Sequence, residues 1–320
     1  MLLGEFDLIR RFFNRSTPSA LLGIGDDAAL LPVTAGNVLA VSTDMLVSGR
    51  HFFADADPYF LGRKSLAVNL SDMAAMGAKP RWAMLSLALP DAGEAWLGPF
   101  SDGFYSIADE YGVELIGGDT TKGPLNICVQ ITGEVGADQA LRRDGAKVDD
   151  DIWVCGELGG AALALMHLQK KIRLSADDLN RCSQRLHDPV PRVALGLALR
   201  GVARSGIDIS DGLIADLGHI LERSQVGAEI RISDVPRGDE LRRYRDHPLG
   251  QQALLAGGDD YELCFTAPPT QSKTIADIGR QLNLPVTTIG RIVAGRELIV
   301  RDERGDAINP ALKGFDHFHC

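Results

Sequence analysis

The chain has 320 residues, more than one ordinary hydrophobic core needs, so we expect two domains. Hydrophobic residues make up 45% and charged residues 24%, a composition typical of a soluble globular protein. The formal net charge of −10 argues against nucleic acid or an anionic membrane as a partner, and no run of about 18 apolar residues is present to span a bilayer.

The five cysteines are an odd number without C-x-x-C spacing. This pattern predicts reduced thiols in a cytoplasmic protein. Glu5 and Asp7 fall where a signal peptide would need an apolar core, so no signal peptide is expected. His317 and His319 are close in sequence, but one pair does not make a zinc site.

The first half of the chain predicts alternating strands and helices. Residues 1–15 alternate like a short amphipathic helix. Asp57-Pro58 is typical of a helix start, and Gly77 with Pro80 is typical of a stop. The other expected elements are a strand at 37–47, a strand at 81–90, a helix at 94–112, a strand at 113–121 that ends in a glycine turn, and a strand at 126–136.

Residues 136–150 are polar and charged, and we interpret them as a linker or the edge of a domain. We therefore expect an N-terminal domain of residues 1–137 and a C-terminal domain of residues 138–320. Both halves mix strands and helices, so the expected fold class is α/β (α+β) for each. The elements expected after the linker are a strand at 151–158, helices within 159–204, a turn feeding a helix at 206–225, a strand at 228–232, a glycine turn and strand at 253–266, a helix at 274–283, and strands at 286–293 and 297–302.

Aspartates recur at the ends of these elements, beside glycine, serine or threonine. One such site is ordinary turn or cap chemistry, but six sites with one theme suggest a shared task. Carboxylate and hydroxyl oxygens are suited to Mg²⁺, and bridging divalent cations let an acidic site attract a triphosphate. We therefore expect several loops to assemble a multi-metal triphosphate site. The aspartates concerned are Asp26, Asp27, Asp44, Asp72, Asp119, Asp208, Asp211, Asp259 and Asp260.

Other phosphate-binding motifs fit less well. Residues 23–28 match the G-x-G-x-x-G/A spacing of a dinucleotide-binding turn, but Pro32 follows before a helix can complete two turns. A Walker motif, G-x-x-x-x-G-K-[ST], does not occur, and neither do the protein-kinase signatures.

Seven segments do form one specific series, namely GIGDDAA, STDMLVSGRHF, KSLAVNLSDMAAMGAKP, LIGGDTTKG, DPVPR, IDISDGL and GGDDYELCFT. In this order they resemble the thiamine-monophosphate kinase family, and the match runs from GEFDLI near the start to KGFDHF near the end. The wider superfamily includes aminoimidazole-ribonucleotide synthetase, selenophosphate synthetase and a hydrogenase-maturation protein. The resemblance implies a two-domain PurM-like architecture and a homodimer formed through the N-terminal domains, which would also bind ATP and Mg²⁺.

The resemblance also implies a reaction, the ATP-dependent phosphorylation of thiamine monophosphate to thiamine diphosphate, by direct in-line transfer with several Mg²⁺ ions. The implied metal ligands are Asp27, Ser42, Thr43, Asp44, Asp72, Asp119, Asp208 and Asp211. The implied nucleotide contacts are Gly118, Asp119, Arg143 and Ser210. The implied thiamine-phosphate contacts are His51, Asp259 and Phe315. No general base is assigned, because a phosphate monoester is already largely ionised at neutral pH.

Three details qualify these assignments. Adjacent strand residues face opposite ways, so Thr43 and Asp44 can both serve only if the strand is ending or one of them uses its backbone. Asp259 stands where the family commonly has Glu, and Phe315 stands where Tyr or Trp is frequent. We expect Asp27 to be the ligand in GIGDD, with Asp26 bonding local backbone.

Two other classes of function remain open on the sequence. The first is a superfamily enzyme with another acceptor. Selenophosphate synthetase needs a reactive residue near its N-terminus, whereas the first cysteine here is Cys128; the hydrogenase-maturation type uses a C-terminal cysteine, and this chain ends in Cys320. The second is a non-catalytic magnesium or nucleotide sensor.

Overall fold

The structure, a computed structural model, describes residues 5–91, 93–244 and 247–308. It divides into two compact units. The N-terminal unit contains Met1–Met73 and Ala78–Asp138, and the C-terminal unit contains Ala74–Gly77 and Gln139–Cys320. Within the described ranges, no helix is both long enough and apolar enough to cross a membrane.

The N-terminal unit opens with α1 (Glu5–Leu8), which continues into a π-helical turn, η1 (Ile9–Phe13). The helix expected at the start of the chain is thus a short α-helix that changes pitch and ends at Phe13. The strand expected at 37–47 is confirmed as β1. The elements that follow are β1 (Asn37–Val47), α2 (Pro58–Ala75), β2 (Lys79–Leu89), α3 (Glu94–Tyr111), β3 (Glu114–Lys122) and β4 (Asn126–Gly136).

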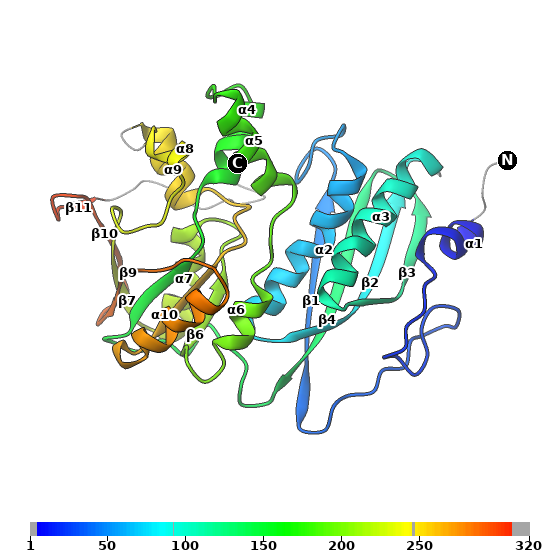
Figure 1. Ribbon diagram of the computed structural model, residues 1–320, viewed down its shortest axis with the longest axis horizontal. Coiled ribbons are helices and arrows are strands. Elements are labelled where there is room, and N and C mark those ends of the chain that lie inside the picture. The colour runs from blue at the N-terminus through cyan, green and yellow to red at the C-terminus, as the bar shows by residue number, and fades with distance from the viewer. Residues whose placement is uncertain (1–4, 92, 245–246, 309–320) are drawn as a thin grey trace. The chain divides into compact units, whose positions relative to one another are not determined.

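These strands form a four-stranded sheet in the order β1-β4-β2-β3. The β2–β3 pair is parallel, and the other two pairs are antiparallel. Alternate residues on one face are buried, for example Leu87 and Ile127, whereas Met45 and Met84 on the other face are exposed. Figure 1 shows α2 and α3 running alongside the sheet, and they cover its buried face.

Helix α2 carries one of the predicted site residues, Asp72. The helix begins where the Asp57-Pro58 pair predicted, and Asp57 Oδ1 accepts the Tyr59 N–H at 2.8 Å. Because Leu66 and Leu70 are fully buried, tertiary packing holds the helix in place, and Asp72 is carried on a rigid element.

Strand β3 corrects one sequence prediction. The two glycines at 117–118 do not end the strand in a turn, because β3 continues to Lys122. Gly118 has a φ of +148°, and a Cβ there would lie 1.8 Å from the carbonyl oxygen of Leu85 on β2. Glycine is therefore needed for the close approach of two strands, and the strand delivers Asp119 from its interior.

The C-terminal unit is built on a seven-stranded sheet in the order β11-β10-β7-β9-β5-β8-β6. Its core includes Ile152, Val154, Ile207, Leu217 and Cys264, all almost fully buried. The strands are β5 (Asp151–Cys155), β6 (Ser205–Asp208), β7 (Gly227–Arg231), β8 (Leu263–Ala267), β9 (Val286–Val293), β10 (Leu298–Arg301) and β11 (Ala307–Ile308). The helices are α4 (Gly160–Leu168), α5 (Ala176–His187), α6 (Val193–Ala198), α7 (Leu213–Ser224), α8 (Asp239–Arg242), α9 (Pro248–Ala256), the short 3₁₀ turn η2 (Pro269–Gln271) and α10 (Ser272–Gln281).

Most elements expected in this half are present (Figure 1), and the strand at 286–293 is confirmed as β9. Residues 206–225 differ from the prediction, because a four-residue strand, β6, precedes the turn and α7. All four residues of β6 are buried, so tertiary pairing with β8 forms a strand that is too short to show periodicity. Helix α9 and the short α8 were not expected either.

Candidate functional site

The first part of the site lies on β1 and α2 of the N-terminal unit. Ser42 Oγ donates a hydrogen bond to Asp72 Oδ2 at 2.5 Å. Strand alternation places Asp44 on the same side of β1 as Ser42, and the next residue in this row, Leu46, is buried. Ser42, Asp44 and Asp72 thus supply hard oxygen atoms on the helix-covered side of the sheet.

Thr43 lies on the opposite side of β1. The strand continues for four residues beyond it, to Val47, so it does not end at the Thr43–Asp44 pair. The sequence allowed Thr43 and Asp44 to bind one ion only if the strand ended there or if one of them used its backbone. Because the strand does not end there, Thr43 can bind the same ion as Asp44 only through its backbone. Its side chain shares the exposed face of the sheet with Met45.

Asp119 also lies on this exposed face. The register pairs Met45 with Cys128, Cys128 with Ser86, and Ser86 with Asp119, so these four residues form one row across the sheet. They line a pocket of about 360 Å³ on that face. Asp44 and Asp119 stand on the two edge strands, about 14 Å apart at three strand spacings, and on opposite faces. The carboxylates of Asp44 and Asp119 from one subunit therefore cannot meet at one ion.

The loops that flank β1 hold two more predicted residues. Asp26 Oδ1 accepts the backbone N–H of Asp27 at 2.9 Å, which confirms that Asp26 bonds local backbone, and Asp27 is exposed. His51 Nδ1 accepts the Val47 N–H at 3.0 Å, so the neutral ring carries its hydrogen on Nε2 and can donate from there.

In the C-terminal unit, the turn between β6 and α7 is organised by a carboxylate that sequence reasoning missed. Asp216 Oδ2 accepts three consecutive backbone N–H groups, from Ser210 at 3.1 Å, Asp211 at 3.0 Å and Gly212 at 3.1 Å. Burial raises the pKa of Asp216 to about 7; the hydrogen bonds from the Asp211 and Gly212 amides oppose this, and the Asp208 and Asp211 charges add to it. The signal for this residue in the sequence was an aspartate in the first turn of a helix, directly after the DISDG loop.

The GGDDYEL segment is tied to the same turn. The Asp259 N–H donates to the Ser210 carbonyl at 2.9 Å, and the Tyr261 N–H donates to the Ile209 carbonyl at 2.8 Å. The Tyr261 hydroxyl lies 3.1 Å from Asp259 Oδ1 and donates to it. Both Asp259 and Tyr261 adopt positive φ angles, of 68° and 50°. Ser210, a predicted nucleotide contact, and Asp259, a predicted substrate contact, are therefore neighbours within one hydrogen-bonded structure.

Beneath that segment lies a layer of buried polar groups. Glu262 forms a two-pronged ion pair with Arg192, and the Cys155 thiol donates to Glu262 Oε2 at 2.9 Å. Burial raises the pKa of Cys155 well above its usual value, with the Glu262 charge as the next cause. Asp260 Oδ2 accepts the Gly159 N–H at 2.8 Å, and burial raises the pKa of this carboxyl as well. Asp260 is partly exposed as a residue, yet its Oδ1 atom is buried.

The structure does not place Arg143 or Phe315 beside the other predicted site residues. Arg143 is exposed, and its backbone carbonyl accepts a hydrogen bond from the Ser224 hydroxyl at 2.8 Å. Phe315 lies outside the described residues.

The donor set fits Mg²⁺ in its chemistry, because every predicted ligand offers oxygen and the Ser42–Asp72 contact already brings two such atoms together. Among the residues that the structure describes, however, no three acidic, histidine or cysteine side chains gather into a metal cluster. The predicted ligands belong to two separate units, so neither unit holds the whole set.

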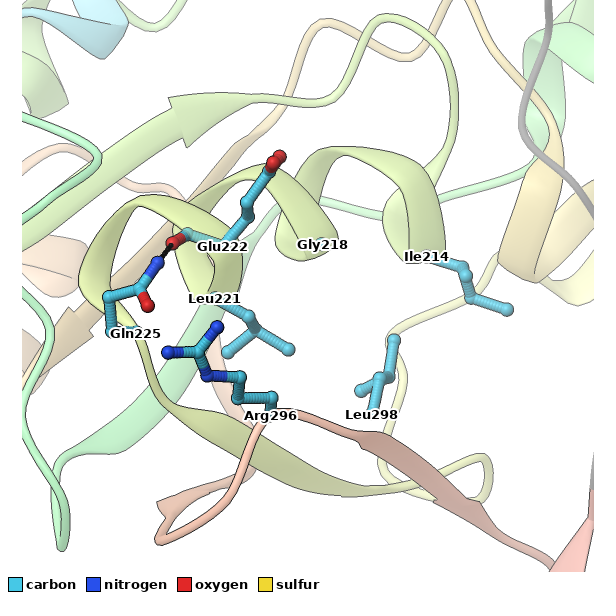
Figure 2. Close-up of a pocket in the computed structure, with 7 residues that line it drawn as sticks. All are labelled: Ile214, Gly218, Leu221, Glu222, Gln225, Arg296 and Leu298. Carbon is cyan, nitrogen blue, oxygen red and sulfur yellow. Dashed lines mark hydrogen bonds between the residues drawn. The ribbon is translucent and has the colours of Figure 1, made fainter.

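A second pocket is distinct from these residues. It has a volume of about 280 Å³ and lies between α7 and β10, where Figure 2 shows Leu221 and Leu298 beside Arg296. It contains none of the predicted site residues. Its α7 members, Ile214, Gly218, Leu221 and Glu222, follow a stripe of that helix which does not include Asp216.

Comparison with known proteins covers the whole chain. Residues 25–135 match the family described as AIR synthase related protein, N-terminal domain, and residues 147–303 match the C-terminal domain of the same family. A thiamine-monophosphate kinase from Escherichia coli O157:H7 is 46% identical over 325 residues, which is 99% of each chain.

Solved structures agree with this result. The thiamine-monophosphate kinase of Stenotrophomonas maltophilia K279a has a TM-score of 0.85 at 46% identity and covers 94% of this chain and 95% of its own. A complex of AaThiL with AMPPCP and TMP has a TM-score of 0.78 at 31% identity and covers 98% and 96%. The hydrogenase maturation protein HypE has a TM-score of 0.78 at 21% identity and covers 96% of each chain, which supports the fold alone. The chain therefore belongs to the thiamine-monophosphate kinase family, within the AIR synthase related proteins.

Proposed function

We propose that this protein transfers the γ-phosphoryl group of ATP to thiamine monophosphate and releases thiamine diphosphate and ADP. The observation that carries the proposal is the 46% identity with a thiamine-monophosphate kinase over 99% of both chains. The AaThiL complex with AMPPCP and TMP adds support, because a relative at 31% identity holds an ATP analogue together with a second ligand.

Several Mg²⁺ ions are part of this proposal. When bound, they neutralise charge on the triphosphate and on the transferring phosphoryl group. Asp72 keeps the Ser42 hydroxyl aligned, and Asp44 adds a carboxylate on the same side of β1. The full ligand set that we propose is Asp27, Ser42, Thr43 through its backbone, Asp44, Asp72, Asp119, Asp208 and Asp211.

The remaining roles divide between nucleotide and acceptor. We assign ATP contacts to Gly118, Asp119, Arg143 and Ser210, and contacts with thiamine phosphate to His51, Asp259 and Phe315. The His51 ring can donate from Nε2 to the acceptor phosphate, because Nδ1 is occupied by the Val47 N–H. No general base is needed, since alignment and charge screening suffice for an ionised phosphate acceptor.

We further propose a homodimer formed through the N-terminal domain, residues 1–137, with residues 138–320 as the second domain of each subunit. The exposed face of the four-stranded sheet supports this, because Val41, Met45 and Met84 are 57%, 53% and 39% exposed. A second copy on this face would bring its own Asp119 toward the partner's sheet edge. In that arrangement, Asp119 of one subunit can reach the edge strand β1 of the other, and we propose that it serves one site with Asp44 around that edge.

Two observations weigh against the alternative acceptors. HypE shares only 21% identity with this chain, whereas the thiamine-monophosphate kinase from Escherichia coli O157:H7 shares 46%. Cys128, the first cysteine, is half-buried within β4, which is a poor place for a selenium-transferring residue. Cys128, Cys155, Cys182 and Cys264 are unpaired, which supports our assignment to the cytoplasm.

One assay tests the proposal. Purified protein is incubated with ATP and Mg²⁺, with and without thiamine monophosphate, and both ADP and thiamine diphosphate are measured. We expect the two products in equal amounts, and only when the acceptor is present. ADP without thiamine diphosphate would indicate another acceptor, and ATP binding without either product would indicate a sensor.

A further inference from the structure

We propose that Asp216 is a positioning residue for phosphoryl transfer, one that holds the turn of residues 209–212 so that Ser210 and Asp211 face the nucleotide and its cations. This inference rests on the proposed function, because Ser210 and Asp211 owe their roles to it. Asp216 itself is not placed in contact with substrate.

The geometry that carries the proposal is the convergence of three successive amides on one oxygen atom. Asp216 Oδ2 lies 3.1, 3.0 and 3.1 Å from the backbone nitrogens of Ser210, Asp211 and Gly212. The Asp216 N–H in return donates to the Gly212 carbonyl at 3.0 Å. Four hydrogen bonds between one residue and one turn fix the backbone from which the Ser210 and Asp211 side chains project.

This contact differs from an ordinary helix cap. A capping side chain usually stands before the helix and accepts N–H groups from inside the first turn. Here the carboxyl belongs to α7, and it accepts N–H groups from residues that precede the helix. Gly212 is the N-cap residue of α7, so one of the three bonds also caps the helix. The other two hold the loop residues Ser210 and Asp211, which are predicted site residues.

The cost of the arrangement also points to a role in the reaction. Asp216 is only 3% exposed, and one of its carboxyl oxygens accepts three amides of the turn. Burying a carboxyl group costs free energy, so this is an expensive way to stabilise a turn that has no other task.

The position of the turn matters beyond the nucleotide. The Ser210 carbonyl accepts the Asp259 N–H at 2.9 Å, and Asp259 is a proposed contact for the thiamine phosphate. A shift of the turn would therefore move a residue on each side of the reacting phosphates. Displacements of about 1 Å in such contacts can lower rates about 100-fold.

The test compares Asp216→Ala and Asp216→Asn with the matched control Asp178→Ala. The Asn variant retains an oxygen that can accept the three amides. The control removes another carboxyl that is 3% exposed, one that pairs with Arg181 and Arg243 on and near α5. Each protein is measured for hydrogen exchange in a peptide spanning residues 207–218, for AMPPCP affinity with Mg²⁺, and for kcat/KM.

We expect Asp216→Ala to exchange the amides of residues 210–212 at least tenfold faster, to bind AMPPCP at least tenfold more weakly and to lose about 100-fold in kcat/KM. Asp216→Asn should fall between this variant and the wild type in all three measurements, and Asp178→Ala should match the wild type in exchange at 207–218 and in AMPPCP affinity. Unchanged exchange in Asp216→Ala, whether affinity is lost or kept, would overturn the positioning role.

Two further outcomes are covered by the same design. If Asp216→Ala does not fold, Asp216→Asn carries the test: protection and AMPPCP affinity that fall together support the proposal, and affinity lost under full protection, or no change in either, refutes it. If the wild type makes no thiamine diphosphate, the proposed function fails, while the exchange and AMPPCP measurements still decide whether Asp216 positions a nucleotide-binding turn.

Discussion

Ser42 Oγ lies 2.5 Å from Asp72 Oδ2, and this hydrogen bond joins the edge strand β1 to helix α2 across 30 residues of sequence. Each partner alone is a common residue at an ordinary position. Together they place a hydroxyl and a carboxylate in contact on the helix-covered side of the sheet, which supports the proposal that both bind a cation.

Asp72→Asn should lower kcat by about 100-fold or more, because one preorganised charge of the site is removed while the hydrogen bond to Ser42 can persist. Ser42→Ala should cost less, about tenfold, because the carboxylate remains. Initial rates measured against Mg²⁺ concentration check both, and the half-saturating concentration should rise in each variant. Ser106→Ala is a suitable control, since its hydroxyl accepts from Arg63 at 2.8 Å and belongs to no proposed site. An unchanged Mg²⁺ dependence in Asp72→Asn would refute the ligand assignment.

Asp44→Asn and Asp119→Asn should each reduce turnover by orders of magnitude without unfolding the protein. Because the two residues lie on opposite faces of one sheet, we expect them to serve one site from different subunits. Mixing the two inactive homodimers and allowing subunits to exchange should then restore activity, since one site of each mixed dimer has both carboxylates.

With free exchange, half of the dimers are mixed and half of their sites are intact, so about a quarter of wild-type activity is expected from statistics alone. The control is each variant incubated by itself under the same conditions. No recovery after proven exchange would mean that Asp44 and Asp119 act within one subunit at different ions.

The sequence predicted the long elements well because their signals are local. Strand β1 coincides with its predicted range of 37–47, and α2 begins at the Asp57-Pro58 pair. Elements that depend on distant partners were missed. Strand β6 has four residues and forms by pairing with β8, and Gly117 and Gly118, which in sequence indicate a turn, lie inside β3.

The candidate site shows the same difference between features with a local sequence signal and features that depend on distant partners. Spacing and residue type predict which acidic residues belong to the site, and the sequence also predicted the local bond between Asp26 and Asp27. The alternation of side chains along a strand also predicted that Thr43 and Asp44 point to opposite faces of the sheet. By contrast, the face on which Asp119 lies depends on the register of four strands. The role of Asp216 depends on a turn that no periodicity describes.

Gly258→Ala should impair the enzyme, because a Cβ at this position would lie 2.4 Å from the Ser210 carbonyl oxygen. That oxygen also accepts the Asp259 N–H, so the substitution must push apart Ser210 and Asp259, the proposed nucleotide and substrate contacts. We expect a loss of about 1–3 kcal/mol in stability and a rise in KM for both ATP and thiamine monophosphate. Steady-state kinetics and thermal unfolding provide the measurements.

Gly218→Ala is the matched control, because it lies in the interior of α7 and an added Cβ would meet nothing within 4 Å. Removing a glycine from a helix interior should stabilise the protein by about 0.5–1 kcal/mol and leave the KM values unchanged. Equal kinetics for the two variants would show that the contact between Gly258 and Ser210 does not position the site.

Arg192→Met should destabilise the C-terminal unit by about 3–5 kcal/mol, because it leaves the Glu262 carboxylate, 8% exposed, without its cation. The measurement is the shift of the urea unfolding midpoint. Arg142→Met is the control, since its ion pair with Asp144 is exposed and its loss should not move the midpoint.

A second readout is the Cys155 thiol, which is fully buried and donates to Glu262 Oε2 at 2.9 Å. Because thiolate is the reactive form and burial raises the pKa of Cys155, this thiol should resist alkylation in the native wild type. It should react faster in Arg192→Met, where local opening exposes it. Wild-type stability together with wild-type alkylation in that variant would show that Glu262 is held by contacts other than Arg192.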